Sequence, residues 1–154
     1  MRIALPGDPV KEGGYHHLVE TILVSAGVLI EHGRVLLTQR KAGTHLAGAW
    51  EFPGGKVEPG EDPRDALARE MAEELGIETT AHEIIDVTFH RYSEHAVLLL
   101  FYRSRRRPRS PEPRPLDIAG FRWARADELD ESVFPPADVS ILKQVRALLG
   151  VEGG

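Results

Sequence analysis

The chain has 154 residues, 42% of them hydrophobic and 28% charged, with a formal net charge of -5 and no cysteine. This length and composition predict one globular domain over 1–154, and they exclude a disulfide scaffold and any site that needs a thiolate. The negative charge argues against duplex nucleic acid as a partner, and no apolar run is long enough to span a membrane, so we expect a cytoplasmic protein.

The first third of the chain predicts a hairpin followed by a functional loop. Residues 1–19 contain glycine and proline without periodicity, which is typical of an irregular lead-in. Two apolar runs, 21–30 and 34–40, flank a turn and predict paired strands. Glycines and prolines recur throughout 48–60, which predicts a long functional loop rather than a regular element.

A helix is predicted from Pro63 to about Leu75. Asp62 is a suitable N-cap, proline is favoured at the first helical position, and Asp65 stands where a capping box places its acid. Gly76 is the expected terminator.

The rest of the chain predicts further strands and one terminal helix. We expect strands at 83–91, 95–102 and around 121–124, with an arginine- and proline-rich loop before residue 115. The terminal helix is indicated by an apolar face made of Ile141, Leu142, Val145, Leu148 and Leu149. Strands and helices interleave without βαβ repeats, so the predicted fold class is α+β, a mixed sheet with helices on its faces.

Three glutamates on the predicted helix form a candidate metal site. Glu70, Glu73 and Glu74 fall within an arc of about 100°, where their charges repel one another. Converging oxygen ligands of this kind suit Mg²⁺ or Mn²⁺. The alternative is a solvated acidic face on which Arg69 pairs with Glu73.

The spacing around these glutamates resembles the Nudix box of the Nudix hydrolases. Gly55, then five residues, Glu61, then seven residues, precede the run Arg69-Glu70-Met71-Ala72-Glu73-Glu74-Leu75-Gly76-Ile77, so the match is unbroken over 55–77. The resemblance implies an α/β/α sandwich and a Mg²⁺-dependent enzyme, with Mn²⁺ as a possible substitute, that hydrolyses a diphosphate linkage. It also implies roles for individual residues: Glu70, Glu73 and Glu74 as metal ligands with the Gly54 carbonyl, and Arg69 and Glu61 as holders of the helix and loop.

Segments outside the box are similar to the MutT branch and its CTP pyrophosphohydrolase relatives. These are Arg40, His45, 50–56 and 134–138. The likeness implies a nucleotide substrate and suggests contacts to it from Arg40, His45, Phe52, Lys56 and Asp138. Asp117 stands where the MutT pattern has a metal-binding glutamate, and its shorter arm puts that fifth ligand in question.

Several of these residues also have an ordinary structural interpretation. Arg40 and His45 are compatible with a strand end and a loop, Trp50 and Phe52 with core packing, and Asp138 with an N-cap of the terminal helix. The arginines between 103 and 114 are interpreted as a solvated loop. The pair His16-His17 lacks further metal ligands.

Three functions therefore follow from the sequence. The first is a pyrophosphohydrolase that converts a nucleoside triphosphate, such as 8-oxo-dGTP or CTP, to the monophosphate. The second is a Nudix hydrolase of another substrate, such as ADP-ribose, a dinucleoside polyphosphate or an RNA 5′ end, with the arginine loop contacting extra phosphates. The third is a non-catalytic nucleotide-binding domain. The chain is expected to be a monomer or a homodimer.

Overall fold

The computed structural model describes residues 19–152. The predicted lead-in and the pair His16-His17 therefore lie outside the described residues, apart from Val19. The strands are β1 (Glu20–Glu31), β2 (Arg34–Gln39), β3 (Trp50–Glu51), β4 (Gly54–Lys56), β5 (Thr79–Arg91), β6 (His95–Arg106) and β7 (Gly120–Ala124). The helices are α1 (Pro63–Leu75), α2 (Leu142–Glu152) and three short 3₁₀ turns, η1 (Ala126–Glu128), η2 (Glu131–Val133) and η3 (Pro136–Asp138).

One mixed sheet organises the molecule around β1. The strand order is β3-β2-β1-β6-β5, with β4 paired to β1 and β7 paired to β2. The pair β1–β6 is parallel and every other pair is antiparallel. A two-residue turn, His32-Gly33, closes the β1–β2 hairpin with φ angles of 52° and 71°, the left-handed backbone that such tight hairpins require.

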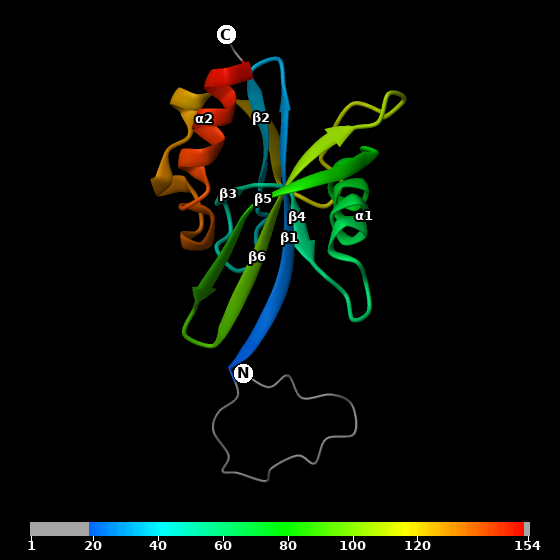
Figure 1. Cartoon of the computed structure of the whole chain (residues 1–154). Helices are drawn as coiled ribbons and strands as arrows, with labels where there is room; N and C mark the ends of the chain where they lie inside the picture. The colour runs from blue at the N-terminus through cyan, green and yellow to red at the C-terminus, as the bar shows by residue number, and fades with distance from the viewer. Residues whose placement is uncertain (1–18, 153–154) are drawn as a thin grey trace, which may run out of the picture.

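Helices cover the two faces of this sheet, with α1 on one side and α2 on the other (Figure 1). Alternate residues of each strand face opposite layers, so two apolar cores form. The α2 core contains Val28, Val35 and Phe101. The α1 core contains Leu29, Leu36 and Tyr102. The predicted α/β/α sandwich with a mixed sheet is confirmed.

Helix α1 has the predicted bounds because its start and stop signals are local. The Asp62 Oδ1 accepts a hydrogen bond of 2.7 Å from the Arg64 N–H. At the other end Gly76 adopts a left-handed φ of 67°, and its N–H donates to the Ala72 carbonyl. A side chain is also excluded at Gly27 on β1, where a Cβ would lie 2.3 Å from the Met71 methyl carbon. This close approach seats the helix on the centre of the sheet.

Several predicted boundaries are wrong. The expected loop 48–60 contains β3 and β4, which are only two and three residues long. The strands β5 and β6 extend beyond the predicted ranges to Thr79 and Arg106. The α2 helix begins at Leu142 instead of directly after Asp138. No helix in the described part of the chain is both long and apolar enough to cross a bilayer.

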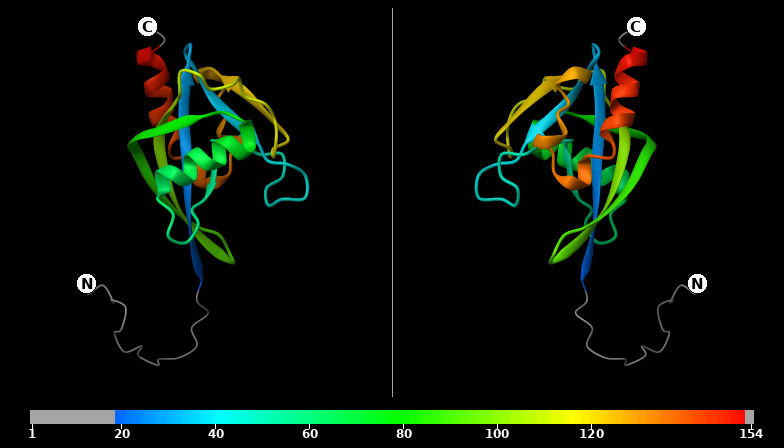
Figure 2. Two further views of the ribbon diagram at one scale, coloured as in Figure 1. Left: turned by 90° about the vertical axis from the view of Figure 1, so that its right-hand side faces the viewer. Right: turned by 90° about the vertical axis from the view of Figure 1, so that its left-hand side faces the viewer.

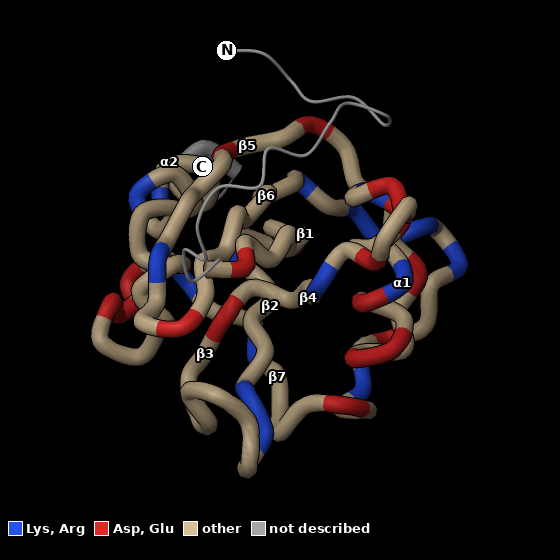
Figure 3. The backbone as a smooth tube through the Cα atoms, turned by 90° about the horizontal axis from the view of Figure 1, so that it is seen from below, with Lys and Arg blue, Asp and Glu red and all other residues tan. Residues whose placement is uncertain are grey.

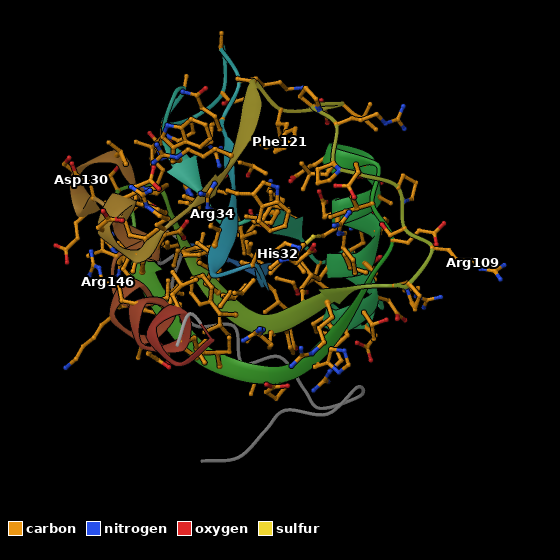
Figure 4. All side chains as sticks on the ribbon, turned by 90° about the horizontal axis from the view of Figure 1, so that it is seen from above. His32, Arg34, Arg109, Phe121, Asp130 and Arg146 are labelled. Atoms are coloured by element: carbon orange, nitrogen blue, oxygen red, sulfur yellow. The ribbon has the colours of Figure 1, made fainter. Side chains whose placement is uncertain are left out.

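The arginine-rich segment is not a single solvated loop. Arg103, Arg105 and Arg106 belong to β6, and Arg103 is buried. The Arg106 guanidinium forms two hydrogen bonds with Glu31, of 2.5 and 2.7 Å. Arg109, in the loop after β6, extends away from the body of the molecule (Figure 4). Only the part after β6 fits the predicted loop.

Candidate active site

A cleft of about 770 Å³ collects most of the predicted site residues. Those that line it are Arg40, His45, Phe52, Gly54, Lys56, Glu70, Glu74, Asp117 and Asp138. Seen from below, acidic positions lie on β3 and on α1, with β4 between them (Figure 3). Glu61, Arg69 and Glu73 do not line the cleft.

The Glu70 carboxylate lies directly over the glycine pair of β4. A Cβ on Gly55 would be 2.4 Å from the Glu70 Cδ, so any other residue at position 55 would displace this carboxylate. Glu70 also shares a hydrogen bond with Glu74. Burial is the main cause that raises the pKa of Glu70, and hydrogen bonding to Arg69 opposes it. The α1 helix thus presents two carboxyl groups to one point beside β4.

Glu74 is the most strongly perturbed of the helix glutamates. Burial, followed by the negative charges of Glu70 and Glu51, raises the pKa of Glu74 to about 9. A hydrogen bond from the Gly54 backbone N–H opposes this shift. Two carboxyl groups that share a hydrogen bond must hold a proton between them unless a cation replaces it.

Arg69 connects α1 to the preceding loop. Its Nε and Nη2 donate to the two carboxylate oxygens of Glu61 at 2.8 and 2.9 Å. Its Nη2 also donates to the Lys56 carbonyl at 3.1 Å. Hydrogen bonds from Arg69 and from the Glu58 N–H lower the pKa of Glu61 to about 2. This network fixes the position of the loop between β4 and α1.

The structure does not bring all three helix glutamates together. The Glu73 side chain is 54% exposed and both of its oxygens lie 3.3 Å from the Arg69 Nη1. Among the described residues no three acidic or histidine side chains are gathered closely enough to hold a metal ion. The half-buried, hydrogen-bonded pair Glu70 and Glu74 nevertheless has the hard oxygen donors and the unrelieved repulsion that a divalent cation would satisfy, so the residues present fit such an ion.

Phe52 and Asp138 form a second part of the cleft lining. The Phe52 ring is 3% exposed and packs against Phe101 and Phe134, with centroids 6.0 and 5.8 Å away. Asp138 is 6% exposed and accepts a hydrogen bond from the Phe52 N–H. Burial, and then the charge of Glu51, raise the pKa of Asp138. The N-cap interpretation of Asp138 is wrong, because the first turn of α2 begins with the Ile141 carbonyl, which accepts from Val145.

Glu51 is a site residue that the sequence interpretation missed. Its carboxylate pairs with the Arg40 Nη1 at 3.0 Å, and its charge raises the pKa of both Glu74 and Asp138. Glu51 is therefore close to both the glutamate pair and Asp138. The sequence feature that points to Glu51 is its position between the two aromatic residues Trp50 and Phe52.

The loop between β2 and β3 lines one side of the cleft mouth. The Arg40 Nε donates to the His45 carbonyl at 2.5 Å. The His45 ring meets Tyr92 and His95 edge-on, at 5.4 and 6.0 Å. Tyr92 and His95 also line the cleft, and no sequence signal pointed to them because pairing of β5 with β6 brings them there.

Of the remaining predicted residues, Asp117 and Trp50 have structural partners. Asp117 forms an ion pair with Lys41, and its side chain is 63% exposed. Lys56 is exposed at the end of β4. Trp50 packs under the Arg122 guanidinium, 4.6 Å from the ring centre, which is a structural contact rather than a free stacking face.

The family of the chain follows from comparison with known proteins. Residues 21–145 match the family model of the NUDIX domain. The chain belongs to the Nudix family. Members typically depend on a divalent metal, and the match covers the cleft, α1 and the loop that precedes it.

The curated relatives of this Nudix chain include two with different substrates in their names. An 8-oxo-dGTP diphosphatase of Haemophilus influenzae is 36% identical over 125 residues, which cover 80% of this chain and 90% of that protein. A CTP pyrophosphohydrolase of Escherichia coli is 51% identical over 67 residues, 44% of this chain and 50% of that one.

Solved structures agree with the fold. The solution structure of the E. coli ORF135 protein has a TM-score of 0.71 at 33% identity and covers 90% of this chain and 97% of its own. The MutT protein from Methanosarcina mazei, at 20% identity and a TM-score of 0.73, covers 85% and 96% and shares the fold.

Proposed function

We propose that this Nudix hydrolase is a Mg²⁺-dependent pyrophosphohydrolase that converts a nucleoside triphosphate and water to the monophosphate and pyrophosphate. The observation that carries the proposal is the arrangement of the cleft. A half-buried carboxyl pair, Glu70 and Glu74, forms one part of its lining, and an aromatic and acidic subsite, Phe52 and Asp138, forms another. A volume of about 770 Å³ is within the range of sites that enclose small ligands.

Glu70, Glu74 and the Gly54 carbonyl are the groups that would hold the metal. Glu73 would join them by leaving Arg69, and Asp117 would join by leaving Lys41. Both side chains are more than half exposed, so neither exchange requires the core to open. A bound divalent cation would neutralise phosphate oxygens and acidify a water molecule.

Basic side chains of the chain itself would receive the rest of the polyphosphate charge. Arg40, Lys41 and Lys56 all line the cleft. Arg40 is held in place by Glu51 and by the His45 carbonyl, so it is oriented before the substrate arrives. Such preorganised charges stabilise the transition state of phosphoryl transfer because they need not reorganise during the reaction.

The protonation of Asp138 decides which base it matches. An ionised carboxylate accepts only, which favours the two adjacent donors of a guanine-type base. Burial raises the pKa of Asp138, so the neutral carboxyl, which both donates and accepts, is favoured. A neutral carboxyl also matches cytosine, which offers an amino donor beside an acceptor nitrogen. We therefore propose 8-oxo-dGTP and CTP or dCTP as the substrates to test first, in line with the names of the two relatives.

The alternative substrates with additional phosphates are less well supported. Binding of such substrates would require arginines of the segment 103–114 to be free to contact the extra phosphates. Arg103 is buried, and Arg106 is paired with Glu31 and Glu112 in a separate pocket that does not include the glutamate pair.

A substrate panel tests the proposal. Initial rates with Mg²⁺ should be measured for 8-oxo-dGTP, CTP, dCTP, the other nucleoside triphosphates, ADP-ribose and a dinucleoside tetraphosphate. We expect the highest kcat/KM for a triphosphate. A clear preference for ADP-ribose or the dinucleotide would contradict the proposed function.

A further inference from the structure

The outer edge of the sheet at β5 carries an exposed apolar row. Ile84, Val87 and Phe89 are 45%, 50% and 61% exposed. Val87 and Phe89 pair with Leu100 and Leu98 of β6, and all four face the α1 side of the sheet. The β5–β6 hairpin reaches beyond α1, so the helix leaves this end of the sheet bare (Figure 2).

The backbone of β5 is unpaired along this edge in the part of the chain that the structure describes. β5 is the last strand in the sheet order. The Tyr92 N–H donates to the His95 carbonyl, so Tyr92 directs its backbone groups toward β6. Alternate residues of an antiparallel strand face the same neighbour, so residues 87, 89 and 91 direct their N–H and C=O groups away from β6. The hydrogen bond of the Val87 N–H is consistent with this orientation, because it is donated to the neighbouring Asp86 Oδ1 and not to β6.

The edge lacks most of the features that protect natural edge strands. The bulges of β5 lie before residue 86, and the stretch 86–91 pairs regularly with β6. That stretch contains no proline and no lysine. Long, regular apolar edges of this kind are templates for another strand.

We propose that β5 pairs antiparallel with β5 of a second copy of the chain, about a two-fold axis at Thr88. In this register Val87 lies opposite Phe89 of the other copy, and the reverse pair repeats across the axis. On the opposite face, where Asp86 accepts a hydrogen bond from the Gln144 Nε2 and Thr88 contacts Ser140, the register places Asp86 opposite His90. A two-fold interface uses the same surface of both copies, so that surface must be complementary to itself. The stretch 86–91 of β5 meets this condition in the register described here.

The register also satisfies the backbone. Val87 and Phe89 of the other copy exchange two backbone hydrogen bonds, and so does the reverse pair. The Val87 N–H then donates to the Phe89 carbonyl of the second copy instead of to the Asp86 side chain. One pair of short strands is a small interface beside the roughly 1,200–2,000 Å² of stable ones, so we expect the dimer to be reversible and to depend on concentration.

Sedimentation equilibrium of the full chain between about 1 and 300 μM tests the proposal. We expect the monomer at the low end and the dimer at the high end. Phe89→Lys should be monomeric throughout, because it places two charges in the apolar row, and it should turn over nucleotide like the wild type. Leu116→Lys, which changes another exposed apolar residue far from β5 in the sequence, is the matched control and should still dimerise.

A cysteine at the axis tests the register in a chain that has none of its own. Residues at a non-hydrogen-bonded antiparallel pair have Cα atoms about 4.5 Å apart, which suits a disulfide. Thr88→Cys should therefore form a linked dimer under mild oxidation at micromolar concentration, and Thr80→Cys, exposed on the same strand before the bulges, should not.

Three results would overturn the proposal. One is a monomer at every concentration. This includes a monomer in which another part of the same chain pairs with β5 and protects the Phe89 amide from hydrogen exchange. Another is a dimer that Phe89→Lys leaves intact. The third is equal disulfide yield from both cysteine variants. Each can occur whether or not the nucleotide activity is present.

Discussion

At the scale of single residues, Glu74 combines burial with like charge. The negative charges of Glu70, Glu51 and Asp117 disfavour the ionised form of its carboxyl, and the hydrogen bond from the Gly54 N–H favours that form. A carboxyl group in such surroundings is poorly suited to stability and well suited to a cation.

Glu74→Gln should keep the fold and lower kcat by about 100-fold or more at saturating Mg²⁺, in the range seen when one preorganised electrostatic group is lost. Glutamine preserves size but removes a charge that the cation needs. Glu78→Gln is the control, since Glu78 is exposed just beyond α1. Retention of more than about a third of the wild-type turnover in Glu74→Gln would mean that the metal site is misassigned.

Asp138→Ala should lower kcat/KM for the preferred base by about 10- to 100-fold, the effect of losing a base contact of ~1 to 3 kcal/mol. A poorly bound base should be affected much less. The ratio of kcat/KM for 8-oxo-dGTP and CTP measures this directly. Asp138→Asn, which keeps an oxygen to accept from the Phe52 N–H, controls for lost stability. If both nucleotides weaken by the same factor in each variant, Asp138 does not contact the base.

At the scale of elements, the close contact between β4 and α1 determines where Glu70 lies. Gly55→Ala should displace the Glu70 carboxylate, because the added Cβ would lie 2.4 Å from the Glu70 Cδ. We expect weaker Mg²⁺ activation, with at least a several-fold higher Mg²⁺ concentration for half-maximal rate. Gly120→Ala is the control, since its Cβ would meet only a glutamine oxygen at 3.9 Å. Identical Mg²⁺ titrations of the two variants would argue against this role of Glu70.

The elements that the sequence predicted well are those with local signals. The cap at Asp62, the buried stripe Leu67, Met71 and Leu75, and the terminator Gly76 together define α1 without reference to the rest of the chain. The short strands β3 and β4 have no such signal. They exist because β2 and β1 offer partners, which is tertiary information.

The parts of the site that the sequence did not predict depend on the same tertiary pairing. Charged arginines suggested a loop after residue 102, yet β1 runs parallel to β6 up to the pair Leu29 and Ser104 and extends that strand. Glu51 contacts Arg40 only because β3 is folded onto β2. Asp117 was expected near the metal, and its partner in the structure is Lys41.

At the scale of the whole molecule, the raised pKa of Glu74 links stability to pH. The carboxyl ionises near 4.5 in the unfolded chain and at about 9 in the folded one. Between these values the Glu74 carboxyl holds a proton in the folded chain but not in the unfolded chain, so its contribution to the free energy of unfolding falls as pH rises, by at most about 1.4 kcal/mol per pH unit.

Without divalent ions, Tm should therefore decrease from pH 5 to pH 9. Mg²⁺ should raise Tm, and raise it more at pH 8 than at pH 5, because it binds the ionised carboxylates of the folded state. Thermal scans in EDTA and in millimolar Mg²⁺ give both quantities, and Glu74→Gln should flatten the pH dependence. A Tm that rises with pH in EDTA, or scans that superimpose with and without Mg²⁺, would count against the proposed role of the half-buried carboxyl pair.

The proposed site around Glu70 and Glu74 is expected to hydrolyse a nucleoside triphosphate to the monophosphate. Phosphorus NMR of 8-oxo-dGTP and of CTP, incubated with the wild-type chain and Mg²⁺, identifies the products directly. We expect equal amounts of nucleoside monophosphate and pyrophosphate, neither product in EDTA, and a rate at least about 100-fold lower with Glu74→Gln. Release of nucleoside diphosphate and phosphate, or no turnover of any nucleoside triphosphate with Mg²⁺ or Mn²⁺, would contradict it.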